Sequence, residues 1–153
     1  MRFFFLLVVF SFFLILGCSS HPIKDKNSYS ISLDKKYLEK LDFDKKELVV
    51  TSVNNQWFYV KKDGKAILAF TTKNGEADIF HEGLARTIVN GKIGFFNKNL
   101  DMVLDPFYDF AFPFYDGVSE VCIGCKEVIH DDGNMLDGGT WKRINRAGLI
   151  IEE

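Results

Sequence analysis

The sequence is poor in the residues that build catalytic and metal centres. It has three cysteines, three histidines and three prolines among 153 residues. It contains no GxSxG, HExxH or phosphate-binding loop motif. Nineteen lysines and arginines balance 21 aspartates and glutamates, and no basic patch is interleaved with aromatic residues. The balanced charge argues against a nucleic-acid partner. We therefore expect neither an enzyme nor a cofactor.

Long hydrophobic runs are missing except at the N terminus, where Arg2 precedes the apolar stretch 3–16. A charged start, a short apolar core and a small residue before the cut are typical of a secretory signal. The run is shorter than the roughly 18 residues that a membrane span needs. Residues 15–18, Ile-Leu-Gly-Cys, resemble the lipobox of bacterial lipoproteins. This resemblance predicts a signal peptide over 1–17 and lipidation of Cys18. An uncleaved apolar anchor, or an ordinary signal with a chance cysteine, is the alternative.

The residues after Cys18 predict where the chain resides and how it is organised. Ser19, not aspartate, follows the cysteine, and by resemblance to sorted lipoproteins this favours the outer membrane. Two or more acyl chains, palmitate among them, would anchor the protein stably. The polar stretch 18–32 is expected to be a tether. About 135 residues remain after the signal, enough for one domain, which we place at 33–153.

An internal repeat runs through this domain. A short aromatic or apolar segment, a polar turn and an apolar segment recur at 57–67, 93–103 and 141–151. Asp-Gly or Asn-Gly pairs at 63–64, 74–75 and 90–91 are hairpin turn signals. The pattern predicts an all-β fold of consecutive antiparallel β-hairpins. A short amphipathic helix is expected near 33–41, where apolar residues recur at helical spacing.

The segments between these copies carry a second signature. Phe-His-Glu-Gly-Leu-Ala at 80–85 precedes the second copy, and Pro-Phe-Tyr-Asp occupies 106–109. The alternation resembles the WG-repeat family of bacterial proteins. Its pattern combines tryptophan-glycine, a glycine-lysine turn, Pro-x-Tyr-Asp and Pro-Phe-x-Glu-Gly-Leu-Ala. The resemblance implies about two and a half β-rich repeats, near 54–92, 93–139 and 140–152, and no general set of catalytic residues.

The resemblance also singles out repeat anchors. Trp57 and Trp141 occupy the tryptophan position in two copies, whereas Ile93 and Gly94 stand for tryptophan-glycine in the middle copy. We expect the side chains at the tryptophan position to be buried anchors of successive hairpins. Phe110, Phe112 and Phe114 alternate, which places them on one face of an extended segment. We favour a core role for them over an aromatic shelf for a sugar or peptide.

Cys122 and Cys125 form the one conventional chemical motif, CxxC. An oxidising compartment would pair them as a structural disulfide, which is the interpretation we favour. A thiol redox site is less favoured, because the following residues alternate like a strand and supply no helix dipole. A metal site would need further ligands, for which His130 and His81 are candidates.

Together these features predict a lipid-anchored protein of the bacterial cell envelope. Its β-repeat domain would bind or scaffold a protein or glycan partner without catalysis, and the membrane would be contacted through lipidated Cys18. The alternative is an envelope thiol-redox or metal-binding protein that uses Cys122 and Cys125.

Overall fold

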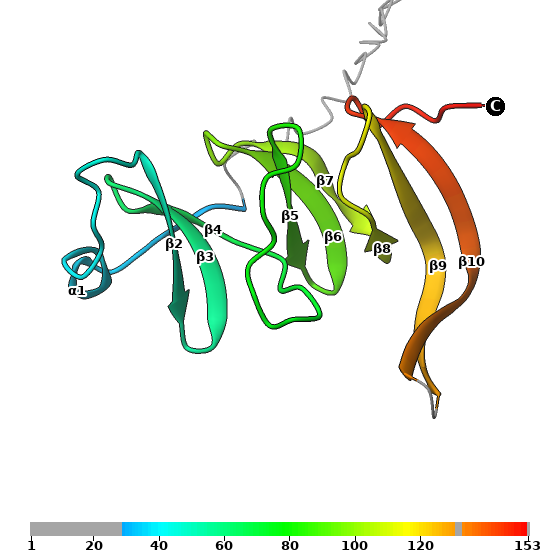
Figure 1. Ribbon diagram of the computed structural model, residues 1–153, viewed down its shortest axis with the longest axis horizontal. Coiled ribbons are helices and arrows are strands. Elements are labelled where there is room, and N and C mark those ends of the chain that lie inside the picture. The colour runs from blue at the N-terminus through cyan, green and yellow to red at the C-terminus, as the bar shows by residue number, and fades with distance from the viewer. Residues whose placement is uncertain (1–28, 131–132, 153) are drawn as a thin grey trace, which may run out of the picture.

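The computed structural model describes residues 29–130 and 133–152 (Figure 1). Antiparallel strands in three small sheets dominate it, so the predicted all-β repeat fold is confirmed. The first sheet has the strand order β1-β4-β3-β2, the second β5-β6-β7 and the third β10-β9-β8. The elements are β1 (Ile31–Ser32), α1 (Lys35–Leu38), β2 (Leu48–Val53), β3 (Gln56–Lys61), β4 (Lys65–Leu68), β5 (Leu84–Val89), β6 (Lys92–Asn97), β7 (Met102–Tyr108), β8 (Phe110–Ala111), β9 (Val118–His130) and β10 (Gly133–Asn145).

Turn chemistry builds the same unit repeatedly. Two-residue turns join β2 to β3 and β5 to β6, and their Asn-Asn and Asn-Gly pairs have the positive φ angles that such hairpins require. After β3, β6 and β10 a second turn is closed by equivalent hydrogen bonds. The amides of Gly64, Leu100 and Gly148 donate to the carbonyls of Lys61, Asn97 and Asn145.

The three sheets lie in a row, each with its faces toward its neighbours (Figure 1). The outermost face of the first sheet is covered by the segment that contains α1. There Leu33 packs with Phe58, Val60 and Ala66, and Leu38 packs against the same cluster. The short helix predicted near 33–41 is thus present, and its role is to close this end of the row.

Two further clusters join the sheets. Between the first and second sheets, Ile67 packs with Ala85 and Phe96, and Tyr59 makes edge contacts with Phe80 and Phe96. Between the second and third sheets the core consists of Leu84, Ile93, Phe95, Ala111, Phe114, Val121 and Ile144. The second sheet is therefore covered on both faces, which explains four consecutive buried residues, 93–96, along β6.

A buried ion pair ties the units together. Arg86 of β5 donates from its backbone amide and Nε to Oδ2 of Asp78, at 2.9 and 3.0 Å, and from Nη2 to Oδ1. Its Nη1 donates to the Ala111 carbonyl of β8 at 2.8 Å, and its guanidinium lies 4.6 Å from the centre of the Phe70 ring. Asp78 is 2% exposed and Arg86 7% exposed. One side chain thus contacts the second sheet, the loop before it and the third sheet.

A second link has the repeat spacing itself. The Glu82-Gly83 and Asp116-Gly117 turns are equivalent, and all four residues have positive φ. The Glu82 carboxylate accepts hydrogen bonds from the Gly117 amide at 3.0 and 3.2 Å. An acidic side chain of one turn therefore caps the next turn, 35 residues later.

Several expected boundaries differ from the structure. The signal region 1–17 and Cys18 lie outside the described residues, as does most of the expected tether 18–32. The tether cannot extend to residue 32, because Ile31 and Ser32 pair with Ala66 and Lys65. The expected repeat boundary between residues 92 and 93 falls inside β6, which pairs with β5 in one sheet. Among the described residues, no helix is long and apolar enough to cross a membrane.

The ion pair generates a stability prediction. Asp78→Ala removes the carboxylate and leaves the Arg86 charge buried without its partner. We expect a loss of about 3 to 5 kcal/mol in the free energy of unfolding, measured by chemical denaturation. Asp78→Ala combined with Arg86→Met should recover part of this loss, because the unpaired charge is then gone.

Glu76→Ala is the matched control, because Glu76 lies in the same loop and is exposed. It should change stability by less than about 0.5 kcal/mol. Equal losses for Asp78→Ala and Glu76→Ala would show that the ion pair does not hold the units together.

Candidate functional site

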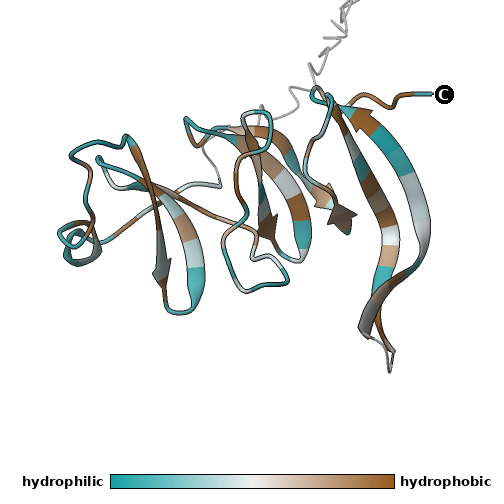
Figure 2. Cartoon of the chain, viewed as in Figure 1, coloured by the Kyte–Doolittle hydropathy of each residue, from teal (hydrophilic) through white to brown (hydrophobic). Residues whose placement is uncertain are grey.

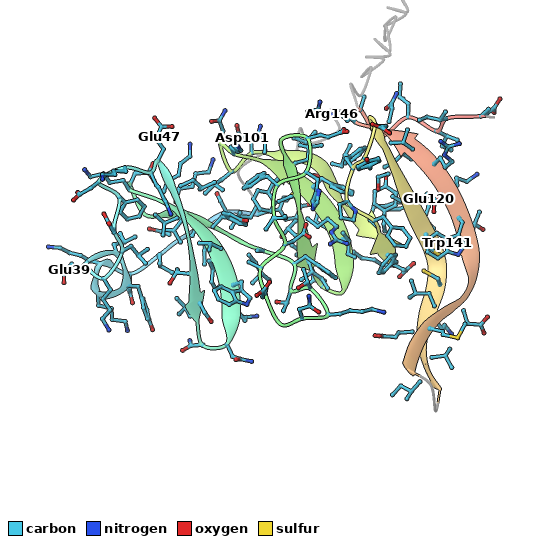
Figure 3. All side chains as sticks on the ribbon, in the orientation of Figure 1. Glu39, Glu47, Asp101, Glu120, Trp141 and Arg146 are labelled. Carbon is cyan, nitrogen blue, oxygen red and sulfur yellow. The ribbon has the colours of Figure 1, made fainter. Side chains whose placement is uncertain are left out.

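The third sheet is the last of the three sheets that the structure describes, and no other described segment forms a sheet over one of its faces. We call this surface the terminal face and define it as Phe112, Glu120, Trp141 and Arg143, all of which are exposed. Strand register explains its position: Glu120 lies opposite Arg143, and Trp141 lies opposite Cys122, which is buried beneath the face and also pairs with Phe110. Figure 3 labels Glu120 and Trp141, which lie at the end of the molecule away from α1.

The terminal face corresponds to surfaces that are covered elsewhere in the molecule. Trp57, Ile93 and Trp141 hold the same repeat position, because each lies the same number of residues before the second turn of its unit. Trp57 faces the second sheet and is half-buried, and its Nε1 donates to the Gly75 carbonyl at 2.8 Å. Ile93 faces the third sheet and is 2% exposed. Trp141 faces away from the row and is 43% exposed.

The expectation that Trp141 is buried is therefore wrong, and the physical reason is its place in the row. Ile93 is covered by the third sheet, and Trp57 is half-buried with its indole bonded to the loop before the second sheet, whereas in the described chain no further sheet packs on the third. The glycine at the next repeat position, Gly94, is required by close backbone packing. A Cβ on Gly94 would lie 2.6 Å from the Leu104 carbonyl oxygen and 2.7 Å from the Pro106 nitrogen, so the backbone of β7 can approach β6 this closely only at a glycine.

Aromatic rings gather on the terminal face. The Phe112 and Trp141 ring centres are 6.1 Å apart with an interplanar angle of 31°. Phe110 contacts both rings edge-on, with its centre 5.0 Å from that of Phe112 and 6.1 Å from that of Trp141, so the three ring centres form a triangle. Phe112 is 45% exposed. These rings form a partly exposed shelf with two ring faces at a shallow angle.

The expected single face for Phe110, Phe112 and Phe114 is only partly observed. Phe114 is 1% exposed and packs edge-on to Phe95 at 4.8 Å, inside the core. Pro113 lies between Phe112 and Phe114, beyond the end of β8, so strict strand alternation does not extend to Phe114. The core interpretation holds for Phe114, whereas Phe112 belongs to the terminal face.

Two charged residues adjoin the aromatic shelf. Glu120 and Arg143 are cross-strand partners and both are exposed. Their equivalents in the second unit are Arg86 and Phe95, which are also cross-strand partners but are buried. At this cross-strand site the third sheet thus has two exposed charged residues. The second sheet has a buried phenylalanine and a buried arginine that is paired with Asp78. Sequence reasoning missed both residues; the signal was the arginine at a repeat position that elsewhere holds an aromatic residue.

Cys122 and Cys125 lie side by side beneath this face. Residues three apart on a regular strand point to opposite faces, but Gly124, with φ +83°, and Gly139, with φ +71°, lie close together where the β9–β10 pairing is interrupted. Both cysteines are free thiols that hydrogen-bond to each other, and they are 0% and 6% exposed. A Cβ on Gly139 would lie 2.7 Å from the Cys122 sulfur, so the thiols also depend on a glycine.

The thiols are in an environment that disfavours the thiolate. Burial, followed by the hydrogen bond to Cys122, raises the pKa of the Cys125 thiol to about 11. Asp109 adds to this shift with its negative charge. Its own pKa is lowered, first by the hydrogen bond from Lys92 and then by the bond from the Gly124 amide. Reactive cysteines instead have a lowered pKa and partial exposure.

The metal alternative gains no further ligands within the part of the chain that the structure describes. That part contains no cluster of three or more His, Cys, Asp and Glu side chains able to hold an ion. The His130 side chain lies outside the described residues. His81 belongs to the turn before β5, where its backbone pairs with Leu84.

A groove of about 690 Å³ separates the second sheet from the long β9–β10 hairpin. Ile88 and Ile93 line one side, and Phe110, Cys125 and Met135 line the other. Figure 2 shows hydrophobic segments on the strands around it. The cysteine pair thus lies between this groove and the terminal face.

Comparison with known families identifies part of this architecture. Residues 93–126 match the family model described as WG containing repeat. The match begins at β6 and ends just after Cys125, so it covers the junction of the second and third sheets. Neither the comparison with curated proteins nor that with solved structures found a match. The expected WG-type repeat is therefore confirmed for this segment.

Proposed function

We propose that this chain is a lipid-anchored envelope protein that binds or scaffolds a partner through its terminal face, without catalysis. One observation carries the proposal. The repeat position that is half-buried in the first unit and fully buried in the second holds an exposed tryptophan in the third. An exposed aromatic cluster beside charged residues is typical of binding surfaces.

The lack of catalysis rests on the chemistry around the one motif that offered an alternative. The Cys125 pKa of about 11 keeps its thiol protonated at neutral pH. A redox dithiol would need a thiolate there. The terminal face itself offers aromatic rings and one carboxylate–guanidinium pair, which suit recognition.

The anchor rests on the sequence around Cys18. The Ile-Leu-Gly-Cys segment resembles a lipobox, and this resemblance would make Cys18 the lipid-bearing first residue of the mature protein. The polar residues that follow Cys18 would separate the domain from the lipid surface.

Capture from cross-linked envelopes tests both parts of the proposal. The tagged wild-type chain should fractionate with the envelope and yield discrete cross-linked products. Cys18→Ser should leave an unlipidated precursor that incorporates no alkyne fatty acid. Trp141→Ala should keep lipidation and location but lose the cross-linked products, because the largest exposed ring of the terminal face is gone.

Ile129→Ala is the matched control for Trp141→Ala. Ile129 is 82% exposed on β9 but lies outside the terminal face, so its replacement should leave the products unchanged. Equal fatty-acid labelling of wild type and Cys18→Ser would contradict the anchor. Unchanged products with Trp141→Ala would contradict binding through the terminal face.

Location in the envelope would also determine the oxidation state of the cysteine pair. In an oxidising envelope, two thiols already in contact would be expected to form a disulfide. This disulfide would close only a short loop across the Gly124 bend. Its contribution to stability would be small, at about 2 kcal/mol or less by loop-closure entropy.

Thiol titration tests the disulfide. Protein purified from envelopes without reductant should show no free thiol from this pair. Cys122→Ser combined with Cys125→Ser should retain the fold and lose about 2 kcal/mol or less of unfolding free energy. Two freely reactive thiols would instead support the redox alternative. Stoichiometric zinc that disappears in the double variant would support the metal alternative.

A further inference from the structure

We propose that the ligand of the terminal face is a saccharide chain, with sugar rings placed on Trp141 and Phe112. This inference rests on the proposed function and names its ligand class. The shelf geometry is the first argument. Two ring faces inclined by 31°, with centres 6.1 Å apart, present a surface on which the flat apolar side of a sugar ring can lie.

The shape of the surface is the second argument. Two shallow hollows, of about 350 and 290 Å³, lie on either side of Glu120 and Arg143, and both residues line both hollows. Trp141 lines the first hollow, and Phe112 with Tyr115 lines the second. Tyr115 is 77% exposed. The arrangement suits consecutive units of a chain, each with its own aromatic contact.

The polar groups between the hollows supply the third argument. A carboxylate only accepts hydrogen bonds at neutral pH, and a guanidinium only donates them. Glu120 and Arg143 lie opposite each other on adjacent strands, so they offer both kinds of partner at one place. Neighbouring hydroxyls of a sugar need this combination, because each hydroxyl both donates and accepts.

The same residues argue against a further sheet or a second copy on this face. Inside the row, the position of Arg143 holds Phe95, which is 1% exposed against the third sheet. Another sheet on the terminal face would bury the Glu120 and Arg143 charges, and burial of charges costs free energy that their attraction only partly offsets. A saccharide can leave both groups hydrated at their edges while it covers the rings.

Calorimetric titration with defined tetrasaccharides tests the inference. The full chain is held in a detergent without a sugar headgroup, and the probes are chitotetraose and cellotetraose, which differ in their acetamido groups. We expect saturable binding of at least one probe with a Kd below about 1 mM. Trp141→Ala and Arg143→Ala should each weaken this binding at least about tenfold.

Ile129→Ala and Trp57→Phe serve as controls and should bind within about twofold of wild type, a difference small on the affinity scale. Thermal melts identify any variant that fails to fold. If one of the two test variants does not fold, the other still tests the inference. Absence of saturable binding to both probes would overturn the saccharide inference, as would binding by Trp141→Ala and Arg143→Ala that is as tight as that of the wild type. If Trp141-dependent cross-linking to a protein, or self-association, persists without saccharide binding, the inference fails while the proposed function stands.

Discussion

Each of the three described sheets is small, and it needs a neighbour packed on at least one of its faces to be stable. This constraint shapes the whole row. The α1 segment closes one end, and the clusters around Phe96 and Phe95 fill the two junctions. Along β6 the constraint removes the usual alternation of buried and exposed residues, because both faces are covered. At the equivalent place in β10, Ile144 is buried while Trp141 and Arg143 are exposed.

The burial of charged side chains differs between the inside of the row and its exposed end. Inside it, Arg86 is buried and satisfied by Asp78 and by the Ala111 carbonyl, so its charge joins three parts of the chain. At the corresponding cross-strand site of the third sheet, Glu120 and Arg143 are exposed. The change from buried to solvated charge leaves a mixed aromatic and polar surface, which is suited to a ligand that carries hydroxyl groups. Repeat units of one kind thus serve packing inside the row and, in the proposed function, recognition at its end.

Local signals in the sequence were sufficient to predict much of this fold. The Asn-Gly at 90–91 and the Asp-Gly at 63–64 lie in tight turns, and the helix expected near 33–41 is present in shortened form. The exposure of Trp141 could not be read in the same way, because it depends on whether another unit follows and covers it. The contact between Cys122 and Cys125 was also hidden, since it depends on the positive φ of Gly124 and Gly139. The Asp78–Arg86 pair joins residues of a loop and a strand, and no periodicity connects them.

One repeat position is buried in the covered second unit and exposed in the third, so its side chain contributes to packing in one and not in the other. Thermal unfolding of Ile93→Ala and Trp141→Ala tests this difference most directly, because the two residues are equivalent by repeat and differ in coverage. Ile93→Ala should lower Tm by roughly 10 °C or more, since a buried side chain of this size contributes about 2 to 5 kcal/mol. Trp141→Ala should lower Tm by about 5 °C or less. A loss for Trp141→Ala as large as that for Ile93→Ala would contradict the account.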